Sequence, residues 1–278
     1  MAVGTYRTST RNMTLAEQWN GSTWSVLPSL NPRGAVTVVL TGVSCASVTR
    51  CTAVGDYTPA RSSSLVPLAE HWNGSNWSVQ AIPVPAGTSR TALQAVSCRL
   101  AASCTAVGWS DISPVGEQPL AEHWDGTSWT IQATPATPGT AALTAVSCAS
   151  ADSCTAAGGA PAPAAPGAAL AEHWDGSTWA AQAIAVPAGA AYLTLTGISC
   201  PTASACTLAG YFSRPTGGAR ALAERRNGTA WKVQQTAAPS THKLPAAISC
   251  TASRACTMTG FTSSLDSGAE APLAEQEP

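Results

Sequence analysis

Ten cysteines carry the clearest chemistry in this chain, because all of them occur in pairs separated by five residues. The pairs are Cys45/Cys51, Cys98/Cys104, Cys148/Cys154, Cys200/Cys206 and Cys250/Cys256. A fully paired set predicts five disulfide bonds, which persist in oxidising compartments, with reduced core thiols as the alternative. A zinc site is disfavoured because its cysteines usually stand about two to four residues apart and two pairs converge on one ion.

Histidine follows glutamate at the same place in three modules of the chain. The pairs are Glu70-His71, Glu122-His123 and Glu172-His173. Equivalent positions in different modules are turned away from one another, so these histidines are not expected to share a metal ion, and no metal or cofactor is predicted. Since the histidine position also holds Gln18 and Arg225, we interpret it as structural. The glutamate is expected to accept hydrogen bonds from the backbone or a neighbouring module.

No set of residues forces a reaction. Sialidase-type chemistry needs an arginine cluster, a tyrosine nucleophile near a glutamate and an acid/base carboxylate. The available tyrosines are Tyr6, Tyr57, Tyr192 and Tyr211, and none has such neighbours at suggestive spacing. Serine is abundant, but the G-x-S-x-G turn of serine hydrolases is absent from the sequence. The sequence therefore leans against an enzyme.

A repeat organises these residues. An L-A-E anchor followed by a tryptophan and a glycine turn returns with a period of about 52 residues, which is typical of solenoids, propellers and arrays. The anchors start near Leu15, Leu68, Leu120, Leu170, Leu222 and Leu273. Between them lies a V-S-C-x5-C-T-A-V-G signature. The unbroken repeat predicts a single domain over residues 1–278.

Each module is expected to form four short antiparallel strands. In one module these are Leu40–Cys45, Cys51–Gly55, Pro67–Trp72 and Trp77–Gln80. Asn73-Gly74 predicts a type I′ hairpin turn between the last two. Small residues recur in the first strand, at Gly42, Ala95, Ala145, Gly197 and Ala247, as expected for an innermost strand with little room.

Four-stranded units without helical periodicity predict an all-β fold, a β-propeller of four-stranded antiparallel blades. Three strands precede the first complete module and three follow the last, which favours six blades with an incomplete first and last blade. Five blades, or a slice of a larger ring, are the alternatives.

The turn Asp125-Gly126-Thr-Ser-Trp129 resembles a compact form of the Asp-box hairpin of sialidase-like repeat propellers. The whole module, with its WNGxxW and VSCx5CTAVG segments, also resembles secreted repeat proteins of uncharacterised function from high-GC bacteria. The first resemblance rests on one turn and shifts the Asp–Gly spacing, so it concerns architecture only.

Binding residues are sought where the modules differ, in the connections between the second and third strands, because loops on a rigid scaffold often bind ligands. Aromatic and arginine side chains are common anchors there. The candidates are Tyr57, Arg61, Trp109, Asp111, Tyr211, Phe212 and Arg214, with Asp56, Phe261 and Asp266 beside them. Trp109 stands outside the repeated tryptophan pairs and is the better candidate among the tryptophans for an exposed contact.

Charged residues make up only 10% of the chain and the net charge is −1, which disfavours a nucleic-acid partner. No segment is apolar enough for a membrane span, and the N-terminus does not resemble a signal peptide. Because the cysteines indicate export, we expect a fragment, or a misassigned start, of a longer secreted or cell-surface protein. It is predicted to be a monomer or part of that longer chain.

The predicted function is a non-enzymatic, extracytoplasmic binding scaffold whose ligand is a protein or a cell-envelope glycan. A sialidase-like glycan hydrolase and a structural module of a larger surface protein are the alternatives.

Overall fold

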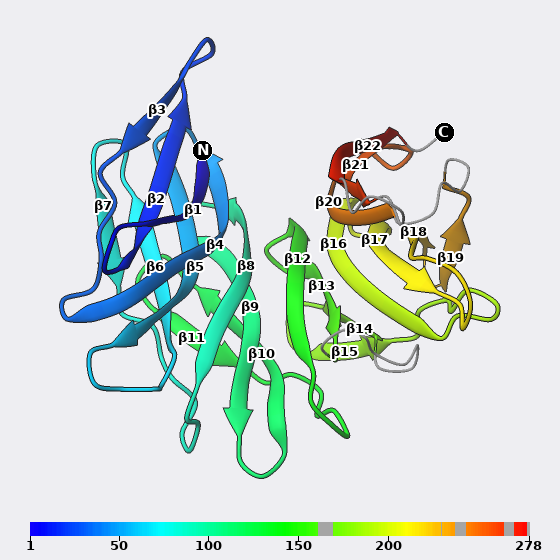
Figure 1. Ribbon diagram of the computed structural model, residues 1–278, viewed down its shortest axis with the longest axis horizontal. Helices are drawn as coiled ribbons and strands as arrows, with labels where there is room; N and C mark the ends of the chain where they lie inside the picture. Colours follow the sequence, from blue (N-terminus) through cyan, green and yellow to red (C-terminus); the bar gives the residue numbers. More distant parts are fainter. Residues whose placement is uncertain (161–168, 229, 237–242, 264–269, 277–278) are drawn as a thin grey trace. The chain divides into compact units, whose positions relative to one another are not determined.

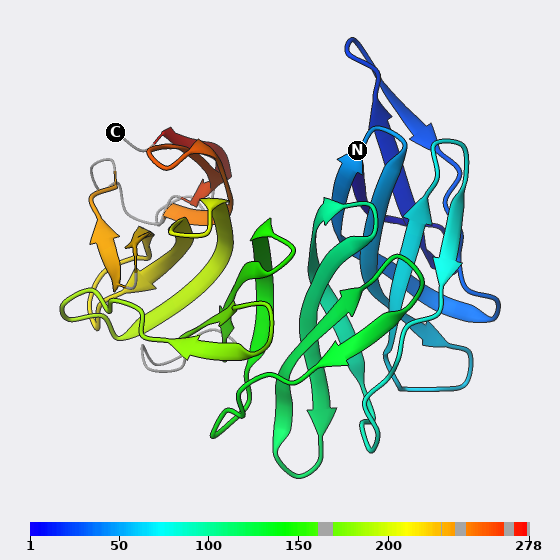
Figure 2. The same cartoon turned by 180° about the vertical axis from the view of Figure 1, so that it is seen from behind.

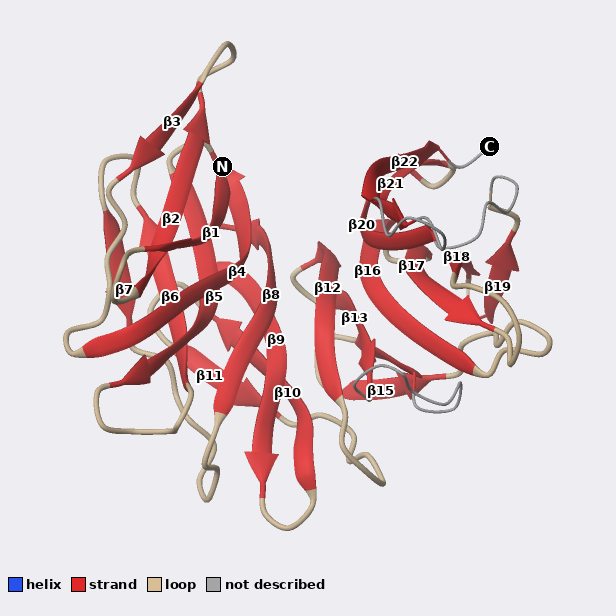
Figure 3. Ribbon diagram, viewed as in Figure 1, coloured by secondary structure: helices blue, strands red, loops and turns tan. Residues whose placement is uncertain are grey.

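The computed structural model describes residues 1–160, 169–228, 230–236, 243–263 and 270–276. The chain forms two compact units, unit 1 (Met1–Gly139) and unit 2 (Thr140–Pro278), which are described separately. The described residues form β-strands and contain no helix (Figure 3). The prediction of an all-β chain is therefore confirmed.

Unit 1 contains eleven strands in three antiparallel groups (Figure 1). A single parallel pairing of Asn12 with Thr37 joins the first two groups into one sheet of seven strands. The strands of the first group are β1 (Ala2–Arg7), β2 (Asn12–Trp19) and β3 (Trp24–Leu27). Those of the second are β4 (Ala35–Ser47), β5 (Arg50–Pro59), β6 (Val66–Trp72) and β7 (Trp77–Gln80). Those of the third are β8 (Thr91–Leu100), β9 (Ser103–Ile112), β10 (Gly116–Trp124) and β11 (Trp129–Gln132).

The described part of unit 2 contains two four-stranded sheets and one three-stranded sheet (Figure 2). The first comprises β12 (Ala142–Ser150), β13 (Ser153–Gly159), β14 (Ala169–Trp174) and β15 (Trp179–Gln182). The second comprises β16 (Tyr192–Thr202), β17 (Ala205–Ser213), β18 (Arg220–Asn227) and β19 (Ala230–Gln234). The third comprises β20 (Lys243–Ala252), β21 (Ala255–Ser263) and β22 (Glu270–Gln276).

The first two strands of a module are longer than predicted. Strand β4 starts at Ala35 rather than Leu40, and β5 continues past Gly55 to Pro59. The turn between the paired cysteines shrinks accordingly, because Ser47 already pairs with Arg50. The extra residues are the variable ones, and no repeat in the sequence marks them as strand.

All five predicted disulfides form, and each joins the first two strands of its module. The bonds are Cys45–Cys51, Cys98–Cys104, Cys148–Cys154, Cys200–Cys206 and Cys250–Cys256. Their Cα atoms lie 3.9–4.0 Å apart. A bridge across a hairpin fixes its register, which otherwise depends on the turn and the hydrophobic pattern.

The turn between the third and fourth strands differs from the type I′ prediction. Four residues, 73–76, separate Trp72 from Trp77, and in this turn only Gly74 has a positive φ, of 99°. The side-chain oxygen of Asn73 accepts hydrogen bonds from the backbone N–H groups of Ser75 and Asn76, both at 2.9 Å. This Asx-type turn explains why asparagine or aspartate stands before the glycine. The flanking tryptophans pack with ring centroids 5.6 Å apart and so help to close the hairpin.

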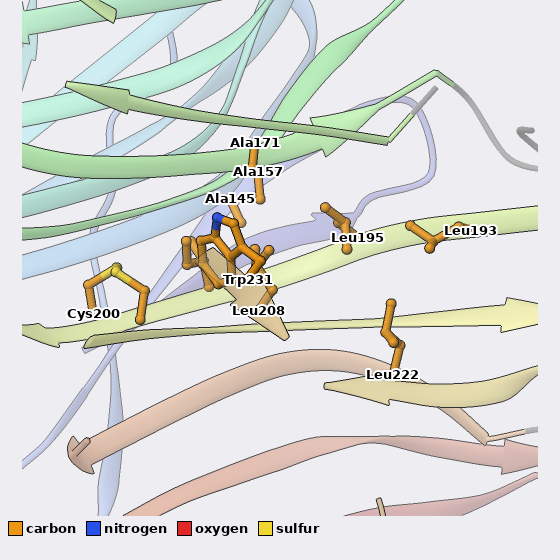
Figure 4. Packing of buried hydrophobic residues seen from close by; sticks show 11 residues of the cluster. Ala145, Ala157, Ala171, Leu193, Leu195, Cys200, Leu208, Leu222 and Trp231 are labelled. Atoms are coloured by element: carbon orange, nitrogen blue, oxygen red, sulfur yellow. A yellow bond between two sulfur atoms is a disulfide. The ribbon is translucent and has the colours of Figure 1, made fainter. Parts of the chain in front are cut away.

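Within each unit, consecutive sheets pack face to face and share a hydrophobic core. In unit 2, Ala145, Ala157 and Ala171 of the sheet β12–β15 lie against Leu208 and Trp231 of the sheet β16–β19 (Figure 4). The small side chains let the larger ones of the next sheet approach closely. A cluster in unit 1 likewise joins the sheets β4–β7 and β8–β11.

Hydrogen bonds repeat across these junctions. The backbone N–H of Cys98 donates to Ser44 Oγ at 2.9 Å, and that of Cys200 donates to Ser147 Oγ at the same distance. The first strands of neighbouring modules leave little space for side chains, as predicted. A Cβ added to Gly42 of β4 would lie 3.2 Å from the Cα of Ala95 of β8.

The two ends of each sheet carry different turns and connections. We call the end with the disulfide hairpins and the Asn-Gly or Asp-Gly turns the turn end. The opposite end, the loop end, carries the connections from second to third strand and from one sheet to the next. Backbone hydrogen bonds join these two kinds of connection, for example from Thr91 N–H to Leu65 O at 3.0 Å.

Candidate functional site

The loop end of unit 1 brings together residues of the sheets β4–β7 and β8–β11. Arg90, which precedes β8, places its guanidinium 5.2 Å from the ring centroid of Trp109 on β9. Asp56 of β5 is close enough to Arg90 for the two charges to interact. Burial raises the pKa of Asp56 to about 6, and Arg90 opposes this rise. An acid, a cation and an aromatic ring thus form one cluster, which we call the Arg90 cluster.

The position of Trp109 corrects the prediction of an exposed contact. Its side chain is only 8% exposed, because it lies within β9 rather than in a loop and Arg90 stacks on its ring. Such a stacked guanidinium is stabilised by the electrons of the aromatic face. Arg90 itself is exposed and is therefore the member of the cluster most open to a ligand.

Asp111 is tied to the same connection. Its backbone N–H donates to Arg90 O at 2.8 Å, and its carbonyl accepts from Ser89 N–H at 3.3 Å. These bonds hold Ser89 and Arg90 alongside β9, as a continuation of β8. Asp111 is half-buried, and its carboxylate accepts a 3.5 Å hydrogen bond from the Ser89 hydroxyl.

The remaining candidates of unit 1 are not gathered into the Arg90 cluster by any described contact. Tyr57 follows Asp56 on β5, and its half-buried ring packs on the hydrophobic cluster of the first two strand groups. Arg61 is exposed in the loop after β5, with a φ of 63°.

In unit 2, Tyr211 and Phe212 lie near the end of β17 rather than in a loop, and Arg214 follows that strand. Phe212 is half-buried against the core cluster, whereas Arg214 is exposed. Phe261 is on β21, and Asp266 lies outside the described residues. No described interaction joins Tyr211 or Phe212 to Arg214.

The paired cysteines do not belong to a ligand site, although they carry the clearest chemistry in the sequence. The second cysteine of every pair is buried in the core rather than open to solvent, with 1–3% of its surface exposed. These buried residues are Cys51, Cys104, Cys154, Cys206 and Cys256. We therefore assign the disulfides a structural role.

Three of the buried sulfur atoms also lie against the neighbouring sheet. Cys104 Sγ is 3.6 Å from the hydroxyl of Thr52, and Cys206 Sγ is 3.7 Å from that of Thr155. Cys256 Sγ is 3.5 Å from the hydroxyl of Thr207. A sulfur atom can also contact its own hairpin: Cys154 Sγ lies 3.8 Å from the carbonyl oxygen of Ser150. The bridges thus take part in packing one sheet on the next, in addition to closing their own hairpins.

The repeated glutamates are fully buried side chains. They are Glu70, Glu122, Glu172 and Glu224, each 0% exposed. Glu224 accepts a 2.9 Å hydrogen bond from the backbone N–H of Ala185, in the connection that precedes its own sheet. That contact agrees with the prediction of a backbone acceptor. In the described residues neither carboxylate oxygen of Glu122 or Glu172 has such a donor.

Burial raises the pKa of all four carboxyl groups. The pKa values are about 7 for Glu70, Glu172 and Glu224 and about 8 for Glu122. A carboxyl group with a raised pKa in a cleft is often catalytic. These four repeat at one place in their sheets and are closed to solvent, so their arrangement suits a structural role.

The histidines before the turn also take local partners. His173 Nδ1 lies 3.1 Å from the hydroxyl of Thr155, and His71 Nε2 lies 3.5 Å from an Arg50 nitrogen. Among the described residues no three histidine, cysteine or acidic side chains form a group that could hold a metal ion. No described helix is long and apolar enough to cross a membrane.

Two features of the structure were not expected from the sequence. Arg90 was overlooked because it lies in a connection between sheets. A basic pocket at the turn end of unit 2 was also overlooked, although Arg225 had been noted as a departure from the repeated histidine. The available signal was the loss of the repeat: Arg225-Arg226 replaces the His-Trp of three other modules.

Neither a protein-family model nor a curated protein sequence matches the chain. Solved structures do match. One is the SapL1 lectin in complex with alpha methyl fucoside, at 12% identity and TM-score 0.53, covering 99% of this chain and 96% of that one.

Another match is the RRP9 WD40 repeats, at 7% identity and TM-score 0.53, covering 86% of this chain and 67% of that one. A mutant of AofleA from Arthrobotrys oligospora is similar at 13% identity and TM-score 0.50, covering 98% and 88%. The lectin and the WD40 repeats are β-propellers, and at such identities the likeness shows the fold alone. The chain therefore has a fold of β-propeller type, built from antiparallel sheets that are mostly four-stranded.

Proposed function

We propose that this chain is a non-enzymatic binding module that acts outside the cytoplasm and recognises a cell-envelope glycan at its loop end. The five disulfides support an oxidising compartment. The likeness to a lectin supports a glycan, because a propeller scaffold of this kind accommodates sugar binding. A protein ligand at the same surface is the second candidate.

The observation that carries the proposal is the Arg90 cluster. It occupies a position at which the modules differ, because the residue after the second-strand glycine is Asp56, Trp109, Gly159, Tyr211 or Phe261. A position needed only for folding would be expected to repeat, as the buried glutamates do. The exposed guanidinium of Arg90, held over Trp109 and beside Asp56, also offers N–H groups that can donate hydrogen bonds to sugar hydroxyls.

Binding of the purified protein to an array of cell-envelope glycans tests the proposal, with Arg90→Ala as the diagnostic variant. Loss of an arginine anchor should weaken binding about tenfold. Arg99→Ala is the matched control, because Arg99 is also exposed in the same sheet but lies at the turn end. The control should bind as the unchanged protein does.

Three outcomes contradict the proposal. Equal loss in both arginine variants would indicate nonspecific charge attraction. Hydrolysis of a chromogenic glycoside that Asp111→Asn abolishes would support the hydrolase alternative. Binding neither to glycans nor to envelope proteins would favour a structural module of a larger surface protein.

For the architecture we propose one propeller of six blades over residues 1–278, with five blades as the alternative. The succession of three, four, four, four, four and three strands supports six, with the first and last incomplete. Averaged electron micrographs of the particle viewed along its axis would count the blades directly, and any number other than six would overturn the proposal.

A further inference from the structure

A cavity of about 360 Å³ lies at the turn end of unit 2, between the sheets β16–β19 and β20–β22. Four of its lining residues are cationic, and none is acidic. The cations are Arg225 and Arg226 of β18, Lys232 of β19 and Arg254 of the β20–β21 turn. Ser204 and Ser253 add hydroxyl groups to the lining.

Two of these cations face each other directly. Arg225 pairs with Lys232 in the register of β18 and β19. Like charges at facing positions of antiparallel strands destabilise the pair. The corresponding pairs in other modules avoid this, since His71 faces Ser78 and His123 faces Thr130. A bound anion between Arg225 and Lys232 would turn the repulsion into attraction.

Arg226 supplies a second, independent observation. Its side chain is only 9% exposed, and its Nε has no hydrogen-bond partner among the described residues. One of its terminal nitrogens donates to Ala203 O at 3.4 Å, but the buried Nε–H group remains without an acceptor among the described residues. A buried guanidinium is unfavourable without a counter-ion, and no ion pair of Arg226 is found in the part of the chain that the structure describes. Burial accordingly lowers the pKa of Arg226.

The repeat shows that the fold does not require these charges. Other modules place tryptophan where Arg226 stands, as Trp72, Trp124 and Trp174 show. Position 254 is equivalent to Ala102 and Ser204 of other modules. The cationic residues therefore replace the residues found in the other modules. These replacements lie on the two sheets that enclose the cavity.

We propose that this pocket binds an oxyanion of the phosphate or sulfate type, carried by a small ester. Arginine matches the geometry of such oxygens with paired N–H groups, and lysine adds a point charge. The cavity is larger than a free phosphate ion, so it has room for the group that bears the anion. The site is at the turn end, and it does not depend on the glycan site proposed for the loop end.

Calorimetric titration of the full chain with glycerol 3-phosphate tests the proposal, with inorganic phosphate, inorganic sulfate and glucuronate as separate arms. Saturable binding of glycerol 3-phosphate is expected, with tighter binding of the ester than of either free ion. Sulfate equal to the ester would assign the site to sulfate. Binding of glucuronate alone, or of none of the four, would overturn the proposal.

The diagnostic variant is Arg226→Trp, which restores the residue of four other modules and is therefore expected to fold. Its affinity for glycerol 3-phosphate should fall about tenfold or more, as expected for loss of a charged hydrogen-bond donor. Its melting temperature without ligand should rise, because a buried unpaired charge is removed. Arg220→Ala is the control, since Arg220 lies at the loop end of the same strand.

A second variant, Arg254→Ala, restores the alanine of another module. It still tests the pocket if the Arg226→Trp variant fails to fold. It should also weaken binding, while the Arg220→Ala control retains it. Unchanged affinity in both pocket variants would sink the proposal, whatever the outcome of the glycan experiment.

Discussion

The indole N–H of Trp129 donates to Gln80 Oε1 at 3.0 Å, which joins β11 to the last strand of the preceding sheet. In unit 2 the same relationship joins Trp231 to Gln182 at 2.9 Å. Each tryptophan is 5% exposed, so its polar N–H group is shielded from water and depends on this one acceptor. In these two pairs of neighbouring sheets, the fourth strand thus fixes both its own hairpin and the next sheet.

Replacement of Gln80 by alanine should therefore destabilise the protein by about 1–2 kcal/mol, because the buried Trp129 N–H loses its acceptor. Chemical denaturation of the variant and of Val79→Ala gives the comparison. Val79 is 46% exposed on the same strand, so its variant should stay within about 0.5 kcal/mol of the unchanged protein. A Trp129→Phe background should abolish most of the Gln80 effect, and full additivity would contradict the coupling.

Alanine at Gly108 should prevent or severely weaken folding. A Cβ at this position would lie 2.0 Å from the carbonyl oxygen of Ala92 on the facing strand, and that backbone atom has no freedom to move away. Destabilisation above about 4 kcal/mol is expected, in the range reserved for severe steric defects. Gly139→Ala is the control, because a Cβ there would meet nothing within 4 Å. Soluble expression and thermal melting measure both, and a well-folded Gly108→Ala protein would be contrary to the geometry.

Stability should decrease as the pH rises from acid toward neutral. The folded-state pKa of Glu122 is about 8, whereas its ordinary value is 4.5. The folded state therefore keeps a proton that the unfolded state releases above pH 4.5. This contribution is complete below pH 4.5 and is lost as the pH approaches about 8.

Glutamine at position 122 mimics the protonated acid, so Glu122→Gln should be more stable than the unchanged protein at pH 8, by roughly 1–3 kcal/mol. At pH 4 the two should be nearly equal. Denaturation midpoints measured across this range test the difference, with Glu117→Gln, at the loop end of the same strand, as the control. An identical pH slope in Glu122→Gln and the unchanged protein would refute the assignment.

Removing one disulfide should cost little by itself. The bridge from Cys98 to Cys104 closes a short loop, so Cys98→Ala with Cys104→Ala is expected to lose about 2 kcal/mol of stability. Mass spectrometry before and after reduction should show a gain of two hydrogens on reduction for each of the five bonds. Free thiols that react with an alkylating agent in the unreduced protein would contradict the paired state.

Much of the fold is predictable because its signals are local. The paired cysteines, the Asn73-Gly74 turn and the fourth strand, Trp77–Gln80, all depend on residues within one module, and the repeat presents each of them several times. The predicted type I′ turn was wrong. The backbone N–H groups of Ser75 and Asn76 donate hydrogen bonds to the Asn73 side chain and close a four-residue loop, which the Asn-Gly dipeptide alone does not specify.

The sequence by itself determined the repeated sheets and their disulfides, since the short-range spacing of residues within one module is enough to specify them. Only the tertiary structure decided the charge environments. Arg90 covers Trp109, and Arg226 reaches a cavity together with Arg254, because packing places different sheets in contact. Burial and charge interactions depend on all neighbours in space, including residues far apart in the chain, and no local pattern records those neighbours.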